Sequence, residues 1–412
     1  MTLLSDMFRE KVGSSKDLRM SMEAKPDIGY STGFPNLDFI NGYLQKIDND
    51  DKDIHYVYKN IGISNGSFIM VIGRSGCGKS TFCEQMAANI IRPFSSSMIF
   101  EDSSETLSMT WQRRQDITGF TPSDLRSKYI IRDSGINAEN FYKRIKMIYN
   151  MKMDNKDEFM YDTGRFDTFG NPVKMFEPTV YILDSIAVLM PEDVLEQDEL
   201  GGNMTVTAGA KVITQIFRGI IQLLKAANII LIVINHILDD ISINGRPKKP
   251  SLTYLKVGET LPRGRTIQYL ANTIIRLDDV TKLKQDEKFK VPGSLVEATL
   301  VKSRSSRANK KTILLFNQNI GFDPVLSSFL FMQQAGRING AGIGLYLDDN
   351  KNMKFSMGNF KEKMNNKEFY DVFIKAYMEE LDKVIESPVD TNETFNNLKL
   401  ANDINKNILM QK

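Results

Sequence analysis

The stretch "GRSGCGKST" (73–81) combines the residue types that bind phosphate groups in proteins. Its glycines allow the backbone to curl until several N–H groups point at one anion, and a following helix adds the partial positive charge of its N-terminus. Lys79 would reach the β- and γ-phosphates, and the Ser80 hydroxyl would bind Mg²⁺. The whole pattern G-x-x-x-x-G-K-[ST] of a phosphate-binding loop (P-loop) is present. We therefore expect ATP and Mg²⁺ to bind at Gly73, Arg74, Ser75, Gly76, Cys77, Gly78, Lys79, Ser80 and Thr81.

Acidic residues end two of the predicted strands. The run "TVYILDS" ends its strand with Asp184, which we expect to hold the Mg²⁺ shell, although acids also end buried strands for ordinary capping reasons. Hydrolysis needs a further carboxylate to orient the attacking water, and "FEDSSETL" offers Glu101, Asp102 and Glu105. Glu101 comes first after the strand "SMIF" and is the preferred catalytic candidate, while Glu105 stays open. The alternative is that these acids only stabilise the start of a helix.

Two further positions are candidates for contact with the nucleotide. His236 ends the apolar run "IILIVINH", where it could respond to the γ-phosphate and pass that signal to the next loop; an ordinary loop histidine is the alternative. Trp111, the single tryptophan, lies close to Arg114 in the predicted helix after "EDSSET". A flat side chain there could stack on adenine, whereas a tryptophan in the core or at an interface would not.

Lys302 and Arg304 in "VKSRSSR" alternate near the end of a predicted strand, so both should face the same way. Two cations on one face are costly unless they meet an anion. We therefore expect this pair to meet an anion. A solvated edge strand that charge protects from aggregation is the alternative.

Two polar loops, 192–207 and 238–266, flank the expected edge of the sheet. The second is rich in Gly, Pro and cations, and a loop of that length is unusual unless it is functional or disordered. Cations grip a nucleic-acid backbone, and an apolar side chain can wedge between unstacked bases. The predicted DNA contacts are Gly202, Asn203, Met204, Arg246, Lys248, Lys249, Lys256, Arg263 and Arg265.

The elements that position these residues read as an α/β fold. The β-branched runs "SFIMVI", "SMIF", "TVYIL" and "IILIVI" alternate with amphipathic helices such as "AKVITQIFRGIIQLLKAAN", which predicts a mainly parallel sheet between helices. Three later runs, "NTIIRL", "LVEATLV" and "KTILLF", follow one another closely and predict hairpin-connected strands that extend the sheet. The segment "DTGRFDTFGNPVKMFEP" predicts a separate hairpin with "GNP" as its turn.

Composition sets broader limits. The chain has 412 residues, and its 53 Lys and Arg nearly balance 51 Asp and Glu, so any nucleic-acid surface must be local. Its two cysteines, Cys77 and Cys83, lie in and just after the P-loop, which argues against a structural disulfide and fits a reducing compartment. The longest apolar run, 229–234, is too short to span a bilayer, and we see no signal peptide. We expect a cytoplasmic protein with no membrane partner.

Four regions are predicted along the chain. Residues 1–50 form an arm in which Leu4, Phe8 and Val12 recur at helical spacing; it could pack on a neighbouring subunit or on its own domain. Residues 51–330 form the ATPase core. Residues 331–385 form a small C-terminal α/β domain that ends in an amphipathic helix, and 386–412 form a polar, Asn-rich tail that we expect to be disordered.

The chain resembles the RecA-like recombinases, and most closely their phage UvsX type, over about residues 30–385. Similar stretches are "STGFPNLD" before the P-loop, "ILDSIAVLMPEDVLEQDELGGNM", "VKSRSSRANKKTILLFNQNIGFDP" and the C-terminal "GIGLYLDDNKNMKFSMGNF". The resemblance implies a RecA-like P-loop ATPase core and a DNA-dependent ATPase. Such a protein assembles into helical filaments on single-stranded DNA, pairs it with homologous duplex DNA and exchanges strands in recombination and repair. Self-association, a single-strand-binding protein and a recombination mediator are the implied partners, and the host cytoplasm is the implied location if a phage encodes the chain.

The same resemblance implies roles for individual residues. In this family the cations corresponding to Lys302 and Arg304 reach the ATP of the adjacent protomer and act on its γ-phosphate, which implies a catalytic role for the pair. One residue inserted after the acidic strand would favour Glu105 as the catalytic acid. RecA has glutamine at the position of His236, although UvsX-type proteins carry histidine there.

Two other functional classes of protein are alternatives. Hexameric DnaB-type replicative helicases share the core, and their catalytic glutamate at the strand end would favour Glu101. We see neither a helicase-type N-terminal domain before "STGF" nor a helicase counterpart of 331–385. A filament mediator that binds ATP but hardly hydrolyses it is the third class, against which Lys79, Asp184 and the cationic pair argue.

Overall fold

The computed structural model describes residues 26–49, 54–103, 110–132, 136–195, 203–239, 252–263, 265–283, 293–317, 320–387 and 399. At 49, 54, 203–208, 265–266 and 281–283 it describes the backbone alone. The predicted arm helix with Leu4, Phe8 and Val12 lies outside these residues. So does nearly all of the predicted tail from residue 388 onward.

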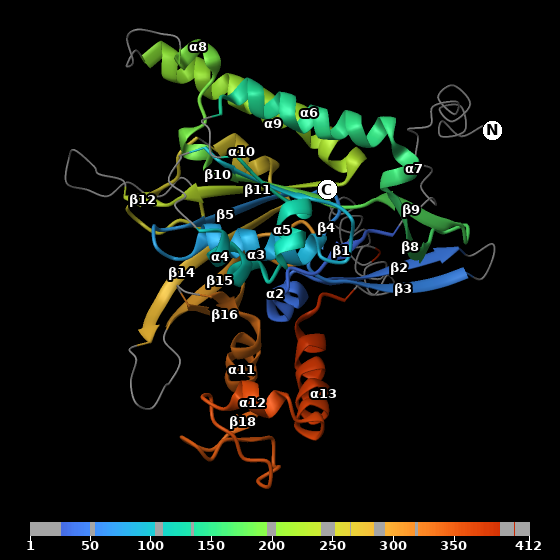
Figure 1. The fold of residues 1–412 in the computed structure, drawn as a ribbon, viewed down its shortest axis with the longest axis vertical. Helices are drawn as coiled ribbons and strands as arrows, with labels where there is room; N and C mark the ends of the chain where they lie inside the picture. The colour runs from blue at the N-terminus through green and yellow to red at the C-terminus, as the bar shows by residue number, and fades with distance from the viewer. Residues whose placement is uncertain are drawn as a thin grey trace, which may run out of the picture.

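A nine-stranded sheet forms the centre of the molecule (Figure 1). Its order is β17 (Gly321–Asp323), β16 (Lys310–Asn317), β15 (Gly293–Lys302), β14 (Thr273–Leu283), β5 (Phe68–Gly73), β11 (Ile229–His236), β10 (Thr179–Asp184), β6 (Met98–Asp102) and β7 (Tyr129–Arg132). The strands from β14 to β7 pair in parallel, and β14, β15, β16 and β17 pair antiparallel. The mainly parallel sheet and its hairpin-connected extension are therefore confirmed.

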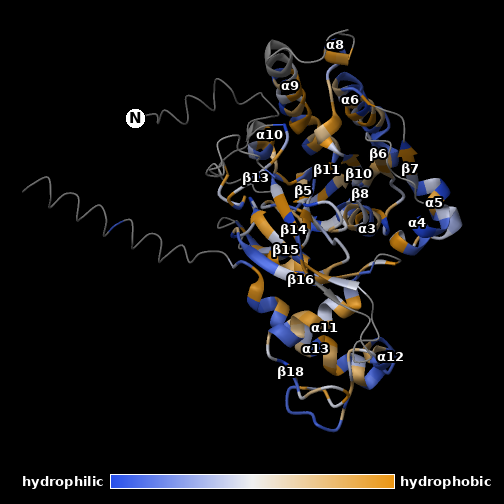
Figure 2. Cartoon of the chain, turned by 90° about the vertical axis from the view of Figure 1, so that its left-hand side faces the viewer, coloured by the Kyte–Doolittle hydropathy of each residue, from blue (hydrophilic) through white to orange (hydrophobic). Residues whose placement is uncertain are grey.

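Helices cover both faces of this sheet, as the unbroken apolar strands require. On one face lie α3 (Lys79–Ile91), α4 (Trp111–Thr118) and α5 (Pro122–Lys128), and on the other α6 (Ala138–Asp154) and α9 (Asn203–Ala227). Side chains alternate along each strand, so Phe100 of β6 packs towards α3 and Ile99 towards α6. Figure 2 shows the apolar strands in the interior, between these helical layers.

The helix predicted from "AKVITQIFRGIIQLLKAAN" is confirmed as α9. Its apolar stripe lies against the sheet, where Ile213, Phe217, Ile220 and Leu224 are at most 1% exposed. Burial of each such side chain contributes about 2 kcal/mol before the loss of conformational entropy is counted. This packing explains why a helix of 25 residues forms beside the central strands.

The amino-terminal boundary differs from the prediction. Residues 26–49 belong to the core, since β1 (Gly29–Tyr30) pairs with β4 (Ile63–Ser64) and α2 (Pro35–Ile40) is buried. The predicted boundary after residue 50 falls between β2 (Tyr43–Asn49) and β3 (Ile54–Asn60), the two strands of one hairpin. The sequence of that hairpin is polar, as linker sequences are, so local hydrophobic periodicity does not predict its two strands.

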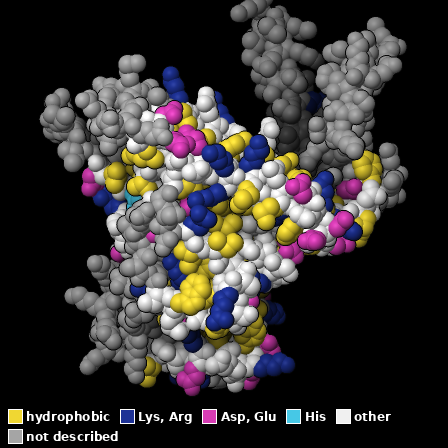
Figure 3. Space-filling view, turned by 45° about the horizontal axis from the view of Figure 1, so that its top comes forward, with side chains coloured by type: hydrophobic (Ala, Val, Ile, Leu, Met, Phe, Trp, Pro, Cys, Tyr) yellow, Lys and Arg dark blue, Asp and Glu magenta, His cyan; other side chains and the backbone are white. Residues whose placement is uncertain are grey.

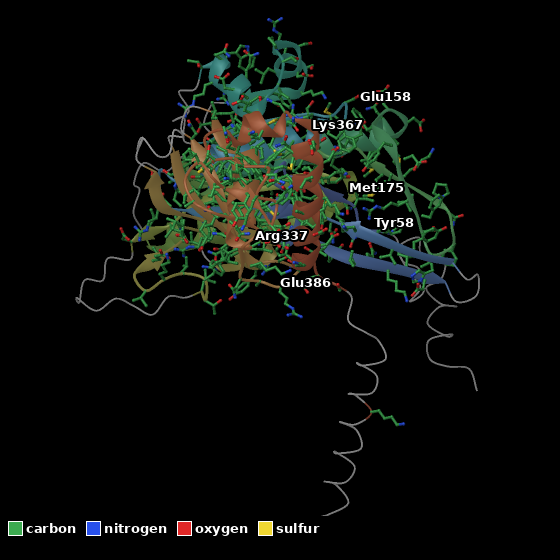
Figure 4. All side chains as sticks on the ribbon, turned by 90° about the horizontal axis from the view of Figure 1, so that it is seen from below. Tyr58, Glu158, Met175, Arg337, Lys367 and Glu386 are labelled. Carbon is green, nitrogen blue, oxygen red and sulfur yellow. The ribbon has the colours of Figure 1, made fainter. Side chains whose placement is uncertain are left out.

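The small C-terminal unit is confirmed as a mixed α/β structure, but it begins earlier than residue 331. It contains α11 (Pro324–Gln334), β18 (Ile338–Asn339), β19 (Tyr346–Leu347), α12 (Phe360–Met364) and α13 (Lys367–Val384). These elements share an apolar cluster that reaches Phe39 of α2 and Leu315 of β16. Arg337 holds the unit together by ion pairs with Asp348, Glu379 and Glu380, and it is labelled in Figure 4.

The predicted "GNP" hairpin is also confirmed. It consists of β8 (Met160–Phe166) and β9 (Pro172–Phe176), which follow the short helix α7 (Lys156–Phe159). The hairpin lies beside β2 and β3, and the Tyr58 hydroxyl accepts a 2.9 Å hydrogen bond from the Phe166 N–H. Figure 4 shows Tyr58 and Met175 on these neighbouring hairpins.

The surface agrees with the nearly balanced charge of the chain. Figure 3 shows Lys and Arg side chains interspersed with Asp and Glu over the face in view. Within the part of the chain that the structure describes, no helix is both long and apolar enough to cross a membrane.

Candidate functional site

The P-loop joins β5 to α3 at the carboxyl end of the parallel strands. Gly76 and Gly78 have φ angles of 85° and 81°, a region that other L-residues rarely adopt. A Cβ at Gly73 would lie 2.5 Å from the Leu277 carbonyl oxygen, so that position also needs glycine. Gly78 directly precedes α3, whose first N–H groups are free of helical partners by geometry and available to an anion.

Lys79 and Ser80 begin α3 and lie where the sequence predicts them. The Lys79 side chain is almost fully buried, and its ammonium donates a 2.7 Å hydrogen bond to the Arg74 carbonyl of the same loop. Burial lowers the pKa of Lys79. The Ser80 hydroxyl donates a 2.5 Å hydrogen bond to Oδ2 of Asp184, so the two predicted Mg²⁺ residues, 104 positions apart, meet at this edge.

Asp184 ends β10 on the face of the sheet that α3 covers. Burial raises its pKa, the Ser80 hydrogen bond opposes that rise, and the negative charge of Asp102 adds to it. Asp102 is the last residue of β6 and is itself 1% exposed. The sequence predicts a strand that ends at Phe100, whereas β6 continues to Asp102, so alternation along the strand places Asp102 and not Glu101 on the face that α3 covers.

Glu101 does not lie where a catalytic acid would be useful. Its carboxylate faces α6, accepts a 2.6 Å hydrogen bond from the Tyr181 hydroxyl and forms an ion pair with Arg144 of α6. This is the face of the sheet opposite to Ser80 and Asp184. The position contradicts the predicted catalytic role of Glu101, because alternation along β6 turns it away from the P-loop. The other candidate, Glu105, lies outside the described residues.

His236 lies beside the P-loop, as predicted. It ends β11 directly opposite Gly73 in the parallel register. Burial, together with the positive charge of Lys79, lowers the pKa of the imidazole. His236 lies two residues before the second predicted loop. In its neutral imidazole one ring nitrogen donates a hydrogen bond and the other accepts one.

The two predicted adenine contacts, Trp111 and Arg114, have different environments. Arg114 is 3% exposed and is directed into the core, where it contacts Oε1 of Glu84 and donates a 2.5 Å hydrogen bond to the Tyr129 hydroxyl. This pairing contradicts a nucleotide-binding role for Arg114, because its guanidinium links α4 to α3 instead. Trp111, three residues earlier on α4, is 46% exposed and accessible to a flat ligand.

Lys302 and Arg304 do face the same way. Lys302 Nζ donates to the carbonyls of Gln268 and Tyr269 at 3.0 and 2.8 Å, and Arg304 donates to Tyr269 at 3.3 Å. These carbonyls end the helix α10 (Arg265–Leu270), where positive charge is favourable. Burial and the neighbouring charge of Arg304 lower the pKa of Lys302 to about 8.

The stem of the second predicted loop is tied to the P-loop. Its ends pair as β12 (Leu238–Asp239) and β13 (Glu259–Thr260). Arg74 of the P-loop donates a 2.7 Å hydrogen bond to Asp239, and its guanidinium lies 3.9 Å from Glu259. Glu259 in turn receives two hydrogen bonds from Arg276 of β14, at 2.7 and 2.9 Å. This network was not predicted, because its members are far apart in sequence.

The predicted DNA contacts are only partly within the described residues. Lys256 is exposed and lies 3.7 Å from Asp278. Arg263 is engaged elsewhere: it donates to the carbonyls of Ile186 and Ala187 in the short 3₁₀ helix Ile186–Val188, which does not fit its predicted DNA contact. Asn203, Met204 and Arg265 lie in the first turns of α9 and α10, with only their backbone described, whereas Gly202, Arg246, Lys248 and Lys249 lie outside the described residues.

The first predicted loop is shorter than 192–207. It contains the helical turn α8 (Glu192–Leu195), and α9 already begins at Asn203.

The donor set suits Mg²⁺. Magnesium prefers hard oxygen ligands and usually takes only one or two carboxylates from a protein that also binds phosphates. The Ser80 hydroxyl and the Asp184 carboxylate supply such oxygens next to the P-loop. No group of three or more His, Cys, Asp or Glu among the described residues could hold a metal on its own.

Comparison with known proteins adds no family. No protein-family model matches the chain, and a search of curated proteins gives no significant match.

Proposed function

We propose that the protein is a DNA-dependent ATPase and recombinase of the UvsX type, with a RecA-like core. It would assemble on single-stranded DNA into a helical filament and exchange strands with homologous duplex DNA. The α/β sheet with a P-loop at the carboxyl end of its parallel strands supports the ATPase part.

The observation that carries the proposal is the separation of two sets of catalytic residues. In the register, Lys302 pairs with Ile274 and Ile274 with Met70, three residues before Gly73. Lys302 is therefore about 10 Å from Gly73 along the strands and about 10 Å across them. Its side chain is directed to α10, away from the P-loop. This separation supports a role of the Lys302–Arg304 pair towards the ATP of another copy of the chain rather than towards its own P-loop, and such a role would need assembly.

The chain's own residues then act as follows. Backbone N–H groups of the P-loop and the Lys79 ammonium bind the phosphates, and Ser80 and Asp184 hold Mg²⁺. When bound, Mg²⁺ neutralises the charge of the β- and γ-phosphates. Lys302 and Arg304 of a neighbouring copy stabilise the charge that develops during phosphoryl transfer, a role worth up to ~10³–10⁵ in rate in other NTPases.

The link to DNA runs through the stem of the second loop. Arg74 contacts Asp239 at one end of the stem, and His236 lies two residues before the stem strand. The stem strands flank residues 240–251 in the sequence, which carry three of the loop's six predicted cations. ATP at the P-loop would therefore bias how this loop grips DNA.

Partners and location follow from this activity. Assembly on single-stranded DNA in cells would meet a single-strand-binding protein and a recombination mediator. Strand exchange would take place in the cytoplasm, or in the host cytoplasm if a phage encodes the chain.

Strand exchange tests the proposal directly. The purified chain, ATP and Mg²⁺ should convert homologous single-stranded circles and linear duplexes into joint molecules, and Lys79→Ala should abolish this conversion. Undiminished exchange by both Lys79→Ala and Lys302→Ala would refute the mechanism. Negative-stain images with a non-hydrolysable ATP analogue should show helical filaments when single-stranded DNA is added. Closed six-fold rings and directional unwinding would instead favour a DnaB-type helicase.

A further inference from the structure

Asp102 lies beside Asp184 on the face of the sheet that α3 covers. The two residues are direct partners in the parallel register of β6 and β10. Side chains of registered parallel neighbours project on the same side of a sheet. The packing agrees, because Phe100 on β6 and Ile182 on β10, two residues before each acid, both belong to the apolar cluster beneath α3.

Both acids are at least nine-tenths buried, at the edge of the sheet where the P-loop leads into α3. Asp102 is 1% exposed and Asp184 is 7% exposed. Two carboxylates this close repel each other when both are ionised, and a cation between them relieves that repulsion. Ser80 approaches Asp184 from the P-loop side, so the relieving cation would also face the phosphates.

The adjacent acid has a different environment. Glu101 faces α6 and is neutralised there by Arg144, while Tyr181 donates to its second oxygen. The two consecutive acids of β6 therefore project from opposite faces of the sheet. Glu101 anchors the strand to α6, and Asp102 faces the P-loop side.

We propose that Asp102 is the second carboxylate of the Mg²⁺ site and, together with Asp184, supplies the negative charge that holds the ion beside Ser80. This inference rests on the proposed ATP binding and assigns a role to a residue of that site.

The test measures nucleotide binding rather than turnover. Affinity for ATPγS is measured by calorimetry over a range of Mg²⁺ concentrations and in EDTA, for the wild type, Asp102→Asn and Glu101→Gln. Asp102→Asn should raise the Mg²⁺ concentration for half-maximal tightening at least ~10-fold, as losses of carboxylates around metal ions commonly do. In EDTA the same variant should bind ATPγS as tightly as the wild type or more tightly, because a negative charge near the phosphates is gone.

The comparison variants make the result specific. Glu101→Gln should leave the Mg²⁺ dependence within about twofold, since its carboxylate faces α6. Asp102→Glu, which keeps the charge, should restore most of the Mg²⁺ affinity, and it serves as the folded variant if Asp102→Asn is unstable. Mn²⁺ in place of Mg²⁺ allows the spin-resonance signal of the bound ion to report the change of ligand directly.

Three outcomes would overturn the inference. Unchanged Mg²⁺ dependence in Asp102→Asn, or in Asp102→Glu a loss as large as in Asp102→Asn, would exclude Asp102 from the ion site. A shift in Glu101→Gln but not in Asp102→Asn would assign the role to the other face. Failure of the proposed function looks different, because the wild type itself would then bind no ATPγS in the presence of Mg²⁺.

Discussion

At the scale of single residues, Lys302 offers a test that depends on pH. Its pKa is lowered from 10.5 to about 8 by burial and by the neighbouring charge of Arg304. The ammonium is therefore present below about pH 8 and is lost as the pH rises through that value. An arginine at this position would stay charged throughout, because guanidinium does not deprotonate in proteins.

We predict that kcat/KM for ATP in the presence of single-stranded DNA falls above pH 8. At pH 9 about a tenth of Lys302 is protonated, so the loss relative to pH 7 should be about tenfold. Lys302→Arg should remain active to higher pH. Identical pH profiles for the wild type and Lys302→Arg would contradict a catalytic charge at Lys302.

The sequence predicts which residues lie at the P-loop edge of the sheet better than it predicts the directions of their side chains. The P-loop, Asp184 and His236 lie where their motifs predict them, because each motif ends a strand at the same edge of the sheet. Glu101 and Arg114 were assigned to the nucleotide but are directed elsewhere. A shift of one residue along a strand reverses the face, and nothing local in "FEDSS" shows that β6 continues to Asp102.

At the scale of elements, the stem of the second loop depends on a buried ion pair. Arg276 and Glu259 each have side chains about 4% exposed and are joined by two hydrogen bonds, whereas Arg74 and Asp239 are joined across an exposed surface. Removal of one partner of a buried pair leaves the other uncompensated, while exposed pairs contribute little.

Arg276→Met should therefore lower the free energy of unfolding by about 3 kcal/mol, because the buried Glu259 carboxylate loses both of its hydrogen bonds from Arg276 and keeps only the Arg74 guanidinium at 3.9 Å. Arg74→Met removes the exposed contact with Asp239 and the longer contact with Glu259 but leaves both hydrogen bonds between Arg276 and Glu259, so it should change this free energy by less than about 1 kcal/mol. Urea unfolding followed by circular dichroism measures both values. Equal losses in the two variants would show that burial does not distinguish these pairs.

Element types were predicted more reliably than their boundaries. The parallel core, the hairpin extension, the "GNP" hairpin and the final amphipathic helix all follow from local periodicity and turn residues. The boundary at residue 50 failed because β2 and β3 carry mixed polar residues and obtain their packing from the β8–β9 hairpin. The boundary at residue 331 failed because the apolar cluster of the C-terminal unit extends to α2 and β16, a tertiary contact that no single segment encodes.

At the scale of the whole molecule, the proposed ATP hydrolysis would need more than one chain. The P-loop lies at the carboxyl end of β5, and Lys302 lies near the amino-terminal ends of β5 and β14. In the proposed assembly one ATP would contact two different surfaces on two copies, and such a heterologous contact propagates into a filament or closes into a ring. DNA would select the filament by aligning successive copies along one strand.

Subunit mixing tests this shared site most directly. Lys79→Ala removes the phosphate-binding lysine, and Lys302→Ala removes the cation that serves a neighbour, so each variant alone should hydrolyse almost no ATP on single-stranded DNA. In an equal mixture, half of the P-loops are intact and half of their neighbours supply Lys302, so random heterologous assembly should restore about a quarter of the wild-type rate. No restoration at any mixing ratio would mean that both lysines must act within one chain, and it would contradict the account.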